Sequence, residues 1–188
     1  MVHRQTTIFG TIAAVLAFLT VLCTLFWLGV IPFPFNREFS RDPYDVTFVP
    51  CAESAATATS PSAMQVNVYN SSNIEGLAGK VSEKLTSLGV NVAETSNWQG
   101  TPVYNSVALY TGEKGVNTAY SLRAYLPHAS IIYDHQITTA TVDVVVSGAW
   151  NEAEDFVAEP DEQALEKAME SLKDCTPAAD IEKEFAKN

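Results

Sequence analysis

Two cysteines in the polar part of this chain could form a covalent bond with each other. Cys51 and Cys175 have neither a C-x-x-C spacing nor a neighbouring histidine, so they do not match a metal site, whereas an oxidising compartment would join them as a disulfide. Closing a loop of about 125 residues would stabilise the fold by about 5 kcal/mol in the idealised chain-entropy model. The alternative is two unrelated buried thiols, because pairing cannot be read from sequence alone.

Nucleophilic catalysis would need a serine, threonine or cysteine beside a base that a third group orients. The polar part of the chain has two histidines, His128 and His135, which we predict in exposed loops. A triad could assemble in space from Ser71, His135 and Asp134, but the sequence has no G-x-S-x-G, S-x-x-K or H-E-x-x-H motif. Two scattered histidines give no zinc-binding pattern. We therefore predict a protein that is not an enzyme and that uses no cofactor or metal.

A polar turn before the first predicted helix is a candidate ligand site. Asn70, Ser71, Ser72 and Gly76 could present free helix amides to a carboxylate or phosphate. The alternative is that Ser72 caps the helix itself, in a capping box with Glu75. Asn70-Ser71-Ser72 is also a formal glycosylation sequon. Exposed aromatic rings often bind carbohydrate, and Trp98, Tyr104 and Tyr110 are candidates, although core or rim packing explains them equally well.

The segments that must position these residues alternate between strand and helix patterns. Apolar alternation predicts strands within 64–69, 90–93, 103–110, 130–133 and 141–146. Helical spacing predicts helices from about 72 to 88, ended by Gly89, and over 116–126. Right-handed crossovers then place both helices on one face of the sheet. The predicted fold class is α/β, an α+β two-layer sandwich with the order β-α-β-β-α-β-β.

Outside this domain the sequence predicts an anchor, a linker and a tail. Residues 8–31 are 24 consecutive uncharged positions, which as a helix of about 36 Å would span a bilayer. We therefore expect a short cytoplasmic head over 1–7, a transmembrane helix over 8–31, an extracytoplasmic linker over 32–63, the domain over 64–150, and an acidic tail over 151–188. The tail should hold one helix that begins near Glu162 and packs on the domain, with binding of a partner as the alternative, and residues 178–188 should be frayed.

The charge distribution excludes two classes of partner. All 22 acidic residues follow the apolar run, and residues 151–188 hold 12 acids against four lysines. Such a surface does not suit nucleic acid, whose phosphates require lysine and arginine, or docking on anionic lipid. The charges that flank the apolar run do not choose its orientation, whereas the proposed disulfide favours export of the C-terminal part.

Three segments resemble the LytR C-terminal domain family: VNVYNSSNIEGLAGKVSEKLTSLGVNV at 66–92, VALYTGEKGVNTAYSLRAYLP at 107–127, and VDVVVSGAW at 142–150. The family usually has Asn-Gly where this chain has Asn70-Ser71. In many members the domain follows a LytR-CpsR-Psr catalytic domain that transfers glycopolymers onto peptidoglycan, and no such domain fits in this chain. Standalone members are associated with envelope integrity.

The resemblance implies a non-catalytic protein of the cell membrane that spans it once, with a cytoplasmic N-terminus and an extracytoplasmic domain that binds or scaffolds cell-wall components or assembly proteins. Its implied partners are a cell-wall polymer or a LytR-CpsR-Psr transferase. The alternatives are a membrane-tethered hydrolase or transferase of cell-wall polymers, and a regulator of a glycopolymer transferase.

Overall fold

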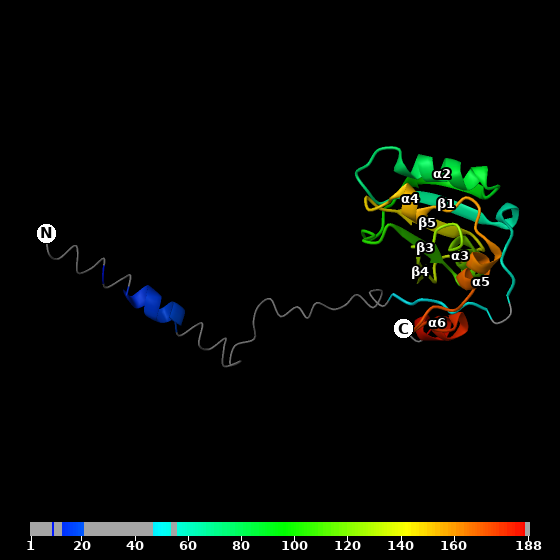
Figure 1. Cartoon of the computed structure of the whole chain (residues 1–188). Helices are drawn as coiled ribbons and strands as arrows, with labels where there is room; N and C mark the ends of the chain where they lie inside the picture. Colours follow the sequence, from blue (N-terminus) through cyan, green and yellow to red (C-terminus); the bar gives the residue numbers. More distant parts are fainter. Residues whose placement is uncertain (1–8, 10–12, 21–46, 54–55, 187–188) are drawn as a thin grey trace. The chain divides into compact units, whose positions relative to one another are not determined.

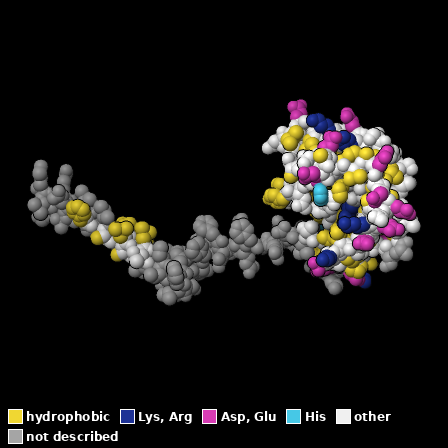
Figure 2. Space-filling model, in the orientation of Figure 1, with side chains coloured by type: hydrophobic (Ala, Val, Ile, Leu, Met, Phe, Trp, Pro, Cys, Tyr) yellow, Lys and Arg dark blue, Asp and Glu magenta, His cyan; other side chains and the backbone are white. Residues whose placement is uncertain are grey.

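A computed structural model describes residues 9, 13–20, 47–53 and 56–186, which fall into two units, Met1–Val46 and Thr47–Asn188. In the first unit, residues 13–20 are helical (Figure 1), and apolar side chains such as Phe18 and Leu19 are exposed on this segment (Figure 2). Across the described ranges, we find no helix with the length and apolar character needed to cross a membrane. Most of the predicted span over 8–31 lies outside the described residues.

The second unit is built on a mixed five-stranded sheet with the order β2-β1-β5-β3-β4. The strands are β1 (Gln65–Asn70), β2 (Asn91–Asn97), β3 (Val107–Thr111), β4 (Ser130–Tyr133) and β5 (Val142–Val146). β1 runs parallel to β2 and to β5, β3 runs parallel to β4, and the antiparallel pairing of β3 with β5 joins the two halves. The two halves are the β-α-β units β1-α2-β2 and β3-α3-β4. Their strands run in opposite directions, so a rotation about the sheet normal relates one half to the other.

One face of the sheet carries the core. Alternate residues of the strands, including Val66, Val68, Leu109, Ile131 and Val144, are buried in a single apolar cluster with residues of α2 (Leu77–Ser87) and α3 (Val116–Leu122). Both helices therefore cover the same face, which confirms a two-layer α+β arrangement for this part of the chain. The opposite face carries the half-buried positions of the strands, and we call it the open face.

The first helix begins later than the capping box predicts. α2 starts at Leu77 after Gly76, whose φ of 75° lies in the left-handed region that glycine adopts readily. The Ser72 hydroxyl instead accepts a hydrogen bond from the Ile74 amide at 3.1 Å, within the turn. The capping-box prediction is therefore wrong, because the Ser72 hydroxyl accepts its hydrogen bond from an amide of the turn and not from an amide of the helix. Gly89, with φ 89°, follows the helix end as predicted.

The strand boundaries also differ from the prediction. β2 continues to Asn97, beyond the predicted strand end at 93, so residues 95–97 pair with the end of β1. β3 begins only at Val107, because residues 103–106 form the loop that crosses from β2. In the second helix, α3 ends at Leu122 rather than near 126.

Residues 56–63, predicted as part of a surface linker, are hydrogen-bonded to the domain. The Thr59 amide donates to the Ser121 hydroxyl at 2.9 Å, and the Asn117 side chain donates to the Thr57 carbonyl at 3.1 Å. A short 3-10 helix, η1 (Pro61–Ala63), then leads into β1. These contacts fix the segment on α3, so its Ala, Ser and Thr composition does not make it a free spacer.

The tail holds three helices rather than one. α4 (Glu152–Asp155) is short, α5 (Glu162–Ala168) packs on α3 as predicted, and α6 (Ala178–Phe185) occupies residues that we predicted to be frayed. α5 is capped by Asp161, whose carboxylate accepts a hydrogen bond from the Ala164 amide at 2.7 Å. Ile181 of α6 is fully buried. The prediction of a frayed end is therefore wrong, because the buried Ile181 side chain anchors α6 on the domain. A single apolar residue of this kind is not detected when the sequence is examined for a repeated apolar stripe along a helix.

An extended segment over 47–51, which we call the strap, lies between the sheet edge and the tail, close to α6 (Figure 1). The Tyr133 amide at the end of β4 donates to the Phe48 carbonyl at 2.8 Å. On its other side the strap pairs with the tail, where the Cys51 amide donates to the Thr176 carbonyl at 3.0 Å and the Thr176 amide donates to the Val49 carbonyl at 2.9 Å. The strap thus covers part of the β4 edge and ties the tail to it.

Candidate functional site

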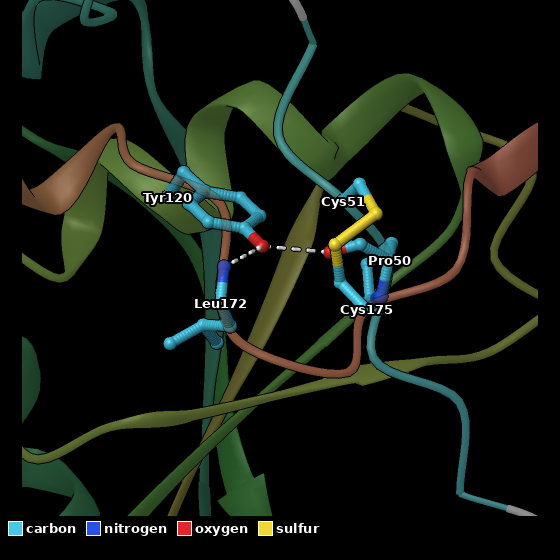
Figure 3. Close-up of a disulfide and its surroundings, with 5 residues drawn as sticks. All are labelled: Pro50, Cys51, Tyr120, Leu172 and Cys175. Atoms are coloured by element: carbon cyan, nitrogen blue, oxygen red, sulfur yellow. Dashed lines mark hydrogen bonds between the residues drawn. A yellow bond between two sulfur atoms is a disulfide. The ribbon is translucent and has the colours of Figure 1, made fainter.

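A disulfide joins the strap to the tail, and one buried side chain of the domain hydrogen-bonds to both segments (Figure 3). Cys51 and Cys175 form a disulfide with their Cα atoms 4.9 Å apart. Beside it, the fully buried Tyr120 of α3 donates its hydroxyl to the Pro50 carbonyl at 2.7 Å and accepts from the Leu172 amide at 3.3 Å. Figure 3 shows the phenol oxygen lying between these two backbone groups. Tyr120 therefore connects the strap, the tail and the domain core.

Replacing Tyr120 with phenylalanine is expected to destabilise the protein by about 1–3 kcal/mol, because the Pro50 carbonyl and the Leu172 amide lose their shared partner while remaining covered. Urea unfolding of the purified full chain measures the change. Tyr125→Phe is the matched control, since the Tyr125 hydroxyl forms no hydrogen bond with the described residues and its loss should cost little. Equal midpoints for the two variants would contradict this role of Tyr120.

In the candidate ligand-facing turn over 70–76, Asn70, Ser71 and Ser72 hydrogen-bond to other groups of the protein, whereas Gly76 is exposed. The Asn70 carboxamide oxygen accepts hydrogen bonds from both the amide and the hydroxyl of Ser72, and its nitrogen donates to the Ile74 carbonyl at 2.8 Å. The Ser71 amide donates to the Val146 carbonyl at 2.8 Å, and the Ser71 hydroxyl accepts from the Val103 amide at 3.3 Å. The turn thus connects β1, β5 and the loop after β2, and these groups are occupied by the protein itself.

The residues of the hypothetical triad lie at opposite ends of the sheet. Ser71 follows the end of β1, which pairs with Val146 and, through β5, with the start of β3 at Val107. His135 follows β4, whose end pairs with Thr111 at the other end of β3. The four-residue interval from 107 to 111 corresponds to about 13 Å along a strand. His135 stacks on Phe185 with ring centroids 4.3 Å apart, so it is not a free loop residue, and the Ser71, His135 and Asp134 triad is wrong.

The second histidine lies beside a buried carboxylate. His128 Nδ1 is 3.2 Å from Asp155 Oδ1, and the same carboxylate accepts hydrogen bonds from the Ser106 hydroxyl and the Asn151 amide. The His128 side chain is largely exposed, as predicted, whereas Asp155 is buried. Asp155 contacts Ser106 in the loop before β3, His128 before β4 and Asn151 at the start of the tail. It therefore fixes the start of the tail on the domain. No group of three or more metal-ligating side chains occurs among the described residues.

Three aromatic side chains form a cluster on the open face of the sheet, which we call the aromatic shelf. Trp98, the residue after β2, lies with its ring centroid 5.6 Å from that of Tyr69 and 4.8 Å from that of Tyr110. The register places Tyr69 opposite Val145 and Tyr110 opposite Asp143, so the two tyrosines lie diagonally across β5. Val145 and its partner Ala108 are the small side chains beside them. Both small residues are fully buried although they point toward the open face, which is consistent with the indole covering them.

The loop after β2 holds the indole in place. The Trp98 Nε1 group donates to the Thr101 carbonyl at 2.8 Å, and the Trp98 amide donates to the Asn70 carbonyl at 2.9 Å. Gly100 lies so close that an added Cβ atom would be 2.6 Å from the indole ring. The turn at Asn70 and the loop over 98–101 therefore position Trp98, and glycine at 100 is required by the close approach of the backbone.

A polar row lies beside the shelf on the same face. The register aligns Asn67 of β1 with Glu94 of β2 and Asp143 of β5, and Asp143 with Tyr110 of β3. The Asn67 side-chain nitrogen donates to Asp143 Oδ1 at 2.8 Å. Burial raises the pKa of the Asp143 carboxyl, while the Asn67 hydrogen bond opposes that shift. Burial also raises the pKa of the Tyr110 hydroxyl and of the Tyr69 hydroxyl.

The sequence indicated only part of this arrangement. Of the predicted aromatic candidates, Trp98 and Tyr110 belong to the shelf, whereas Tyr104 is 90% exposed in the loop before β3 and is not among its ring contacts. Sequence reasoning missed Tyr69, Asn67 and Asp143 as site residues. The signal was available in VNVYN and VDVVV, where these residues alternate with buried valines and must therefore share the face opposite the core.

The five-stranded mixed sheet with two helices on one face defines a small α+β domain that also carries a covalently closed strap and tail. Residues 63–150 match the family described as LytR cell envelope-related transcriptional attenuator, LytR_C. The chain therefore contains a LytR_C domain over these residues.

A solved structure is similar to the chain at 21% identity: the soluble domain of a conserved hypothetical secreted protein from Mycobacterium marinum. The likeness covers 61% of this chain and 88% of that one, with a TM-score of 0.47. The comparison with curated proteins finds no match.

Proposed function

We propose that this chain is a single-pass protein of the cell envelope whose exported LytR_C domain is a non-catalytic module that binds or scaffolds cell-wall components or assembly proteins. The observation that carries the proposal is the family match over 63–150, because the family's description is cell-envelope-related. The uncharged run over 8–31 supports a membrane anchor, with residues 32–46 as the link to the strap.

Two further features support export of the domain. A disulfide between Cys51 and Cys175 is suited to an oxidising compartment and would not persist in a reducing cytoplasm. The acidic surface, on which Asp and Glu side chains are widely distributed (Figure 2), suits neither nucleic acid nor anionic lipid. The separation of Ser71 from His135 removes the catalytic constellation on which the hydrolase alternative depended.

Deleting the gene is expected to increase sensitivity to detergents and to antibiotics that must cross the envelope. The test compares the deletion strain with strains that express the full chain or a chain lacking residues 8–31 behind a cleavable export signal. We expect the full chain to restore resistance and the unanchored chain to restore it less, because tethering raises the local concentration at the membrane. Unchanged permeability and growth of the deletion strain would contradict the proposal.

Crosslinking in cells followed by mass spectrometry distinguishes the kinds of partner. Recovery of a LytR-CpsR-Psr transferase would favour regulation of glycopolymer transfer, and recovery of peptidoglycan fragments would favour direct binding to the wall. Either result is compatible with an exported module, whereas crosslinks only to cytoplasmic proteins would contradict the proposed topology.

A further inference from the structure

The open face combines two features that recur where proteins bind sugars. Planar aromatic rings offer apolar surface to the C–H groups of a sugar ring, and carboxylate or carboxamide groups exchange hydrogen bonds with its hydroxyls. Here Tyr69, Trp98 and Tyr110 form the aromatic part, and the hydrogen-bonded Asn67 and Asp143 lie in the adjacent row of the same sheet face.

The polar pair retains hydrogen-bonding capacity. Asn67 uses its nitrogen and Asp143 uses Oδ1 in their mutual hydrogen bond. Within the described residues, no hydrogen bond involves Asp143 Oδ2 or the Asn67 side-chain oxygen. Both residues are half-buried at positions fixed by the strand register. Two acceptors held on a rigid strand pair can accept from neighbouring hydroxyl groups without much loss of side-chain entropy.

The charges around the pair select against anionic ligands. Glu94 and Asp134 are the charged groups that act on Asp143, and both are acidic. Glu94 also lies within 3.5 Å of the Tyr69 hydroxyl, at the edge of the shelf. A polymer that carries phosphates or free carboxylates on its sugar rings would be repelled here, whereas uncharged sugar rings would not.

We propose that the open face binds an uncharged glycan strand of the cell wall, with a sugar ring stacked on the aromatic shelf and its hydroxyls hydrogen-bonded to Asn67 and Asp143. This inference rests on the proposed exported location, since the glycan lies outside the membrane. Trp98 has a positioning role in addition, because its indole fixes the loop over 98–101 and its main chain is bonded to Asn70.

A purely structural role for the aromatic cluster makes a different prediction. If the rings serve only to pack the loop over 98–101 onto the sheet, replacing Asn67 would alter neither the loop nor any measurable binding. Asn67 and Tyr69 are therefore better test positions than Trp98, since both are partly exposed and neither is part of the apolar core.

The experiment is cosedimentation of the full chain, purified in detergent, with peptidoglycan sacculi stripped of phosphodiester-linked polymers. We expect saturable binding that a soluble uncharged glycan, the β-1,4-linked tetramer of N-acetylglucosamine, reduces by competition. Tyr69→Ala and Asn67→Ala should each weaken binding by about 3- to 10-fold, the equivalent of one lost contact of ordinary strength.

Tyr104→Ala is the matched control, because it removes a largely exposed tyrosine outside the shelf and should leave binding unchanged. Thermal melting of each variant verifies folding. The inference is overturned if stripped sacculi do not bind, if only unstripped sacculi bind, or if folded Tyr69→Ala and Asn67→Ala bind as well as the native chain. These outcomes are independent of the deletion phenotype, so loss of this inference leaves the proposed envelope function standing.

Discussion

Replacing Cys51 and Cys175 together with serine is expected to lower the free energy of unfolding by about 2–5 kcal/mol. The bridge closes a loop with a sequence separation of 124 residues, so its removal returns much conformational freedom to the unfolded chain. In the folded state it also holds the strap beside Thr176, where two backbone hydrogen bonds join the segments.

Urea unfolding of the full chain with and without reductant measures this effect. We expect reductant to destabilise the native chain by the same amount and to leave the double variant unchanged. Cys23→Ala is the matched control, because it changes the one cysteine outside the bridge and should not alter the reductant effect. Hydrogen exchange should increase first over 47–51 and 176–185. A variant as stable as the oxidised native chain would contradict this account.

The part of the fold that sequence predicts well is the part governed by apolar alternation. Valines at 66, 68, 142, 144 and 146 must share one face, and the helical spacing of Leu77, Val81 and Leu85 supplies the layer that covers them. Crossover handedness then decides that both helices lie on that face. The same alternation, read for the polar residues between the valines, would have located the open face and its shelf.

The elements that sequence predicts poorly are those decided by competing local hydrogen bonds. Ser72 matches a capping box by spacing, but Asn70 captures its amide and hydroxyl, so the helix starts only after Gly76 adopts its left-handed conformation. Likewise, residues 95–97 are polar and read as loop, yet they lie beside β1 and complete its ladder. The start of a helix or the end of a strand therefore depends on hydrogen-bond partners that are distant in sequence, or on groups within one turn that compete for the same partner.

Replacing Ile181 with alanine is expected to cost about 2–5 kcal/mol, because the side chain is fully buried and its removal leaves a cavity. α6 also contacts the domain through Ala178, which packs against the core, through the ring contacts of Phe185 with Phe48 and His135, and through the hydrogen bond from the Tyr133 hydroxyl to Glu182. Ile181 is therefore the apolar anchor of the helix that sequence reasoning took for a frayed end.

Glu184→Ala on the exposed side of α6 is the matched control and should change stability by no more than about 0.5 kcal/mol. Urea unfolding of the oxidised chain is the measurement. Ile181 and the disulfide hold the same strap and tail, so combining Ile181→Ala with the double cysteine replacement should cost less than the sum of the separate effects. Strict additivity, or an Ile181→Ala chain as stable as the native one, would mean that α6 is not a cooperative part of the domain.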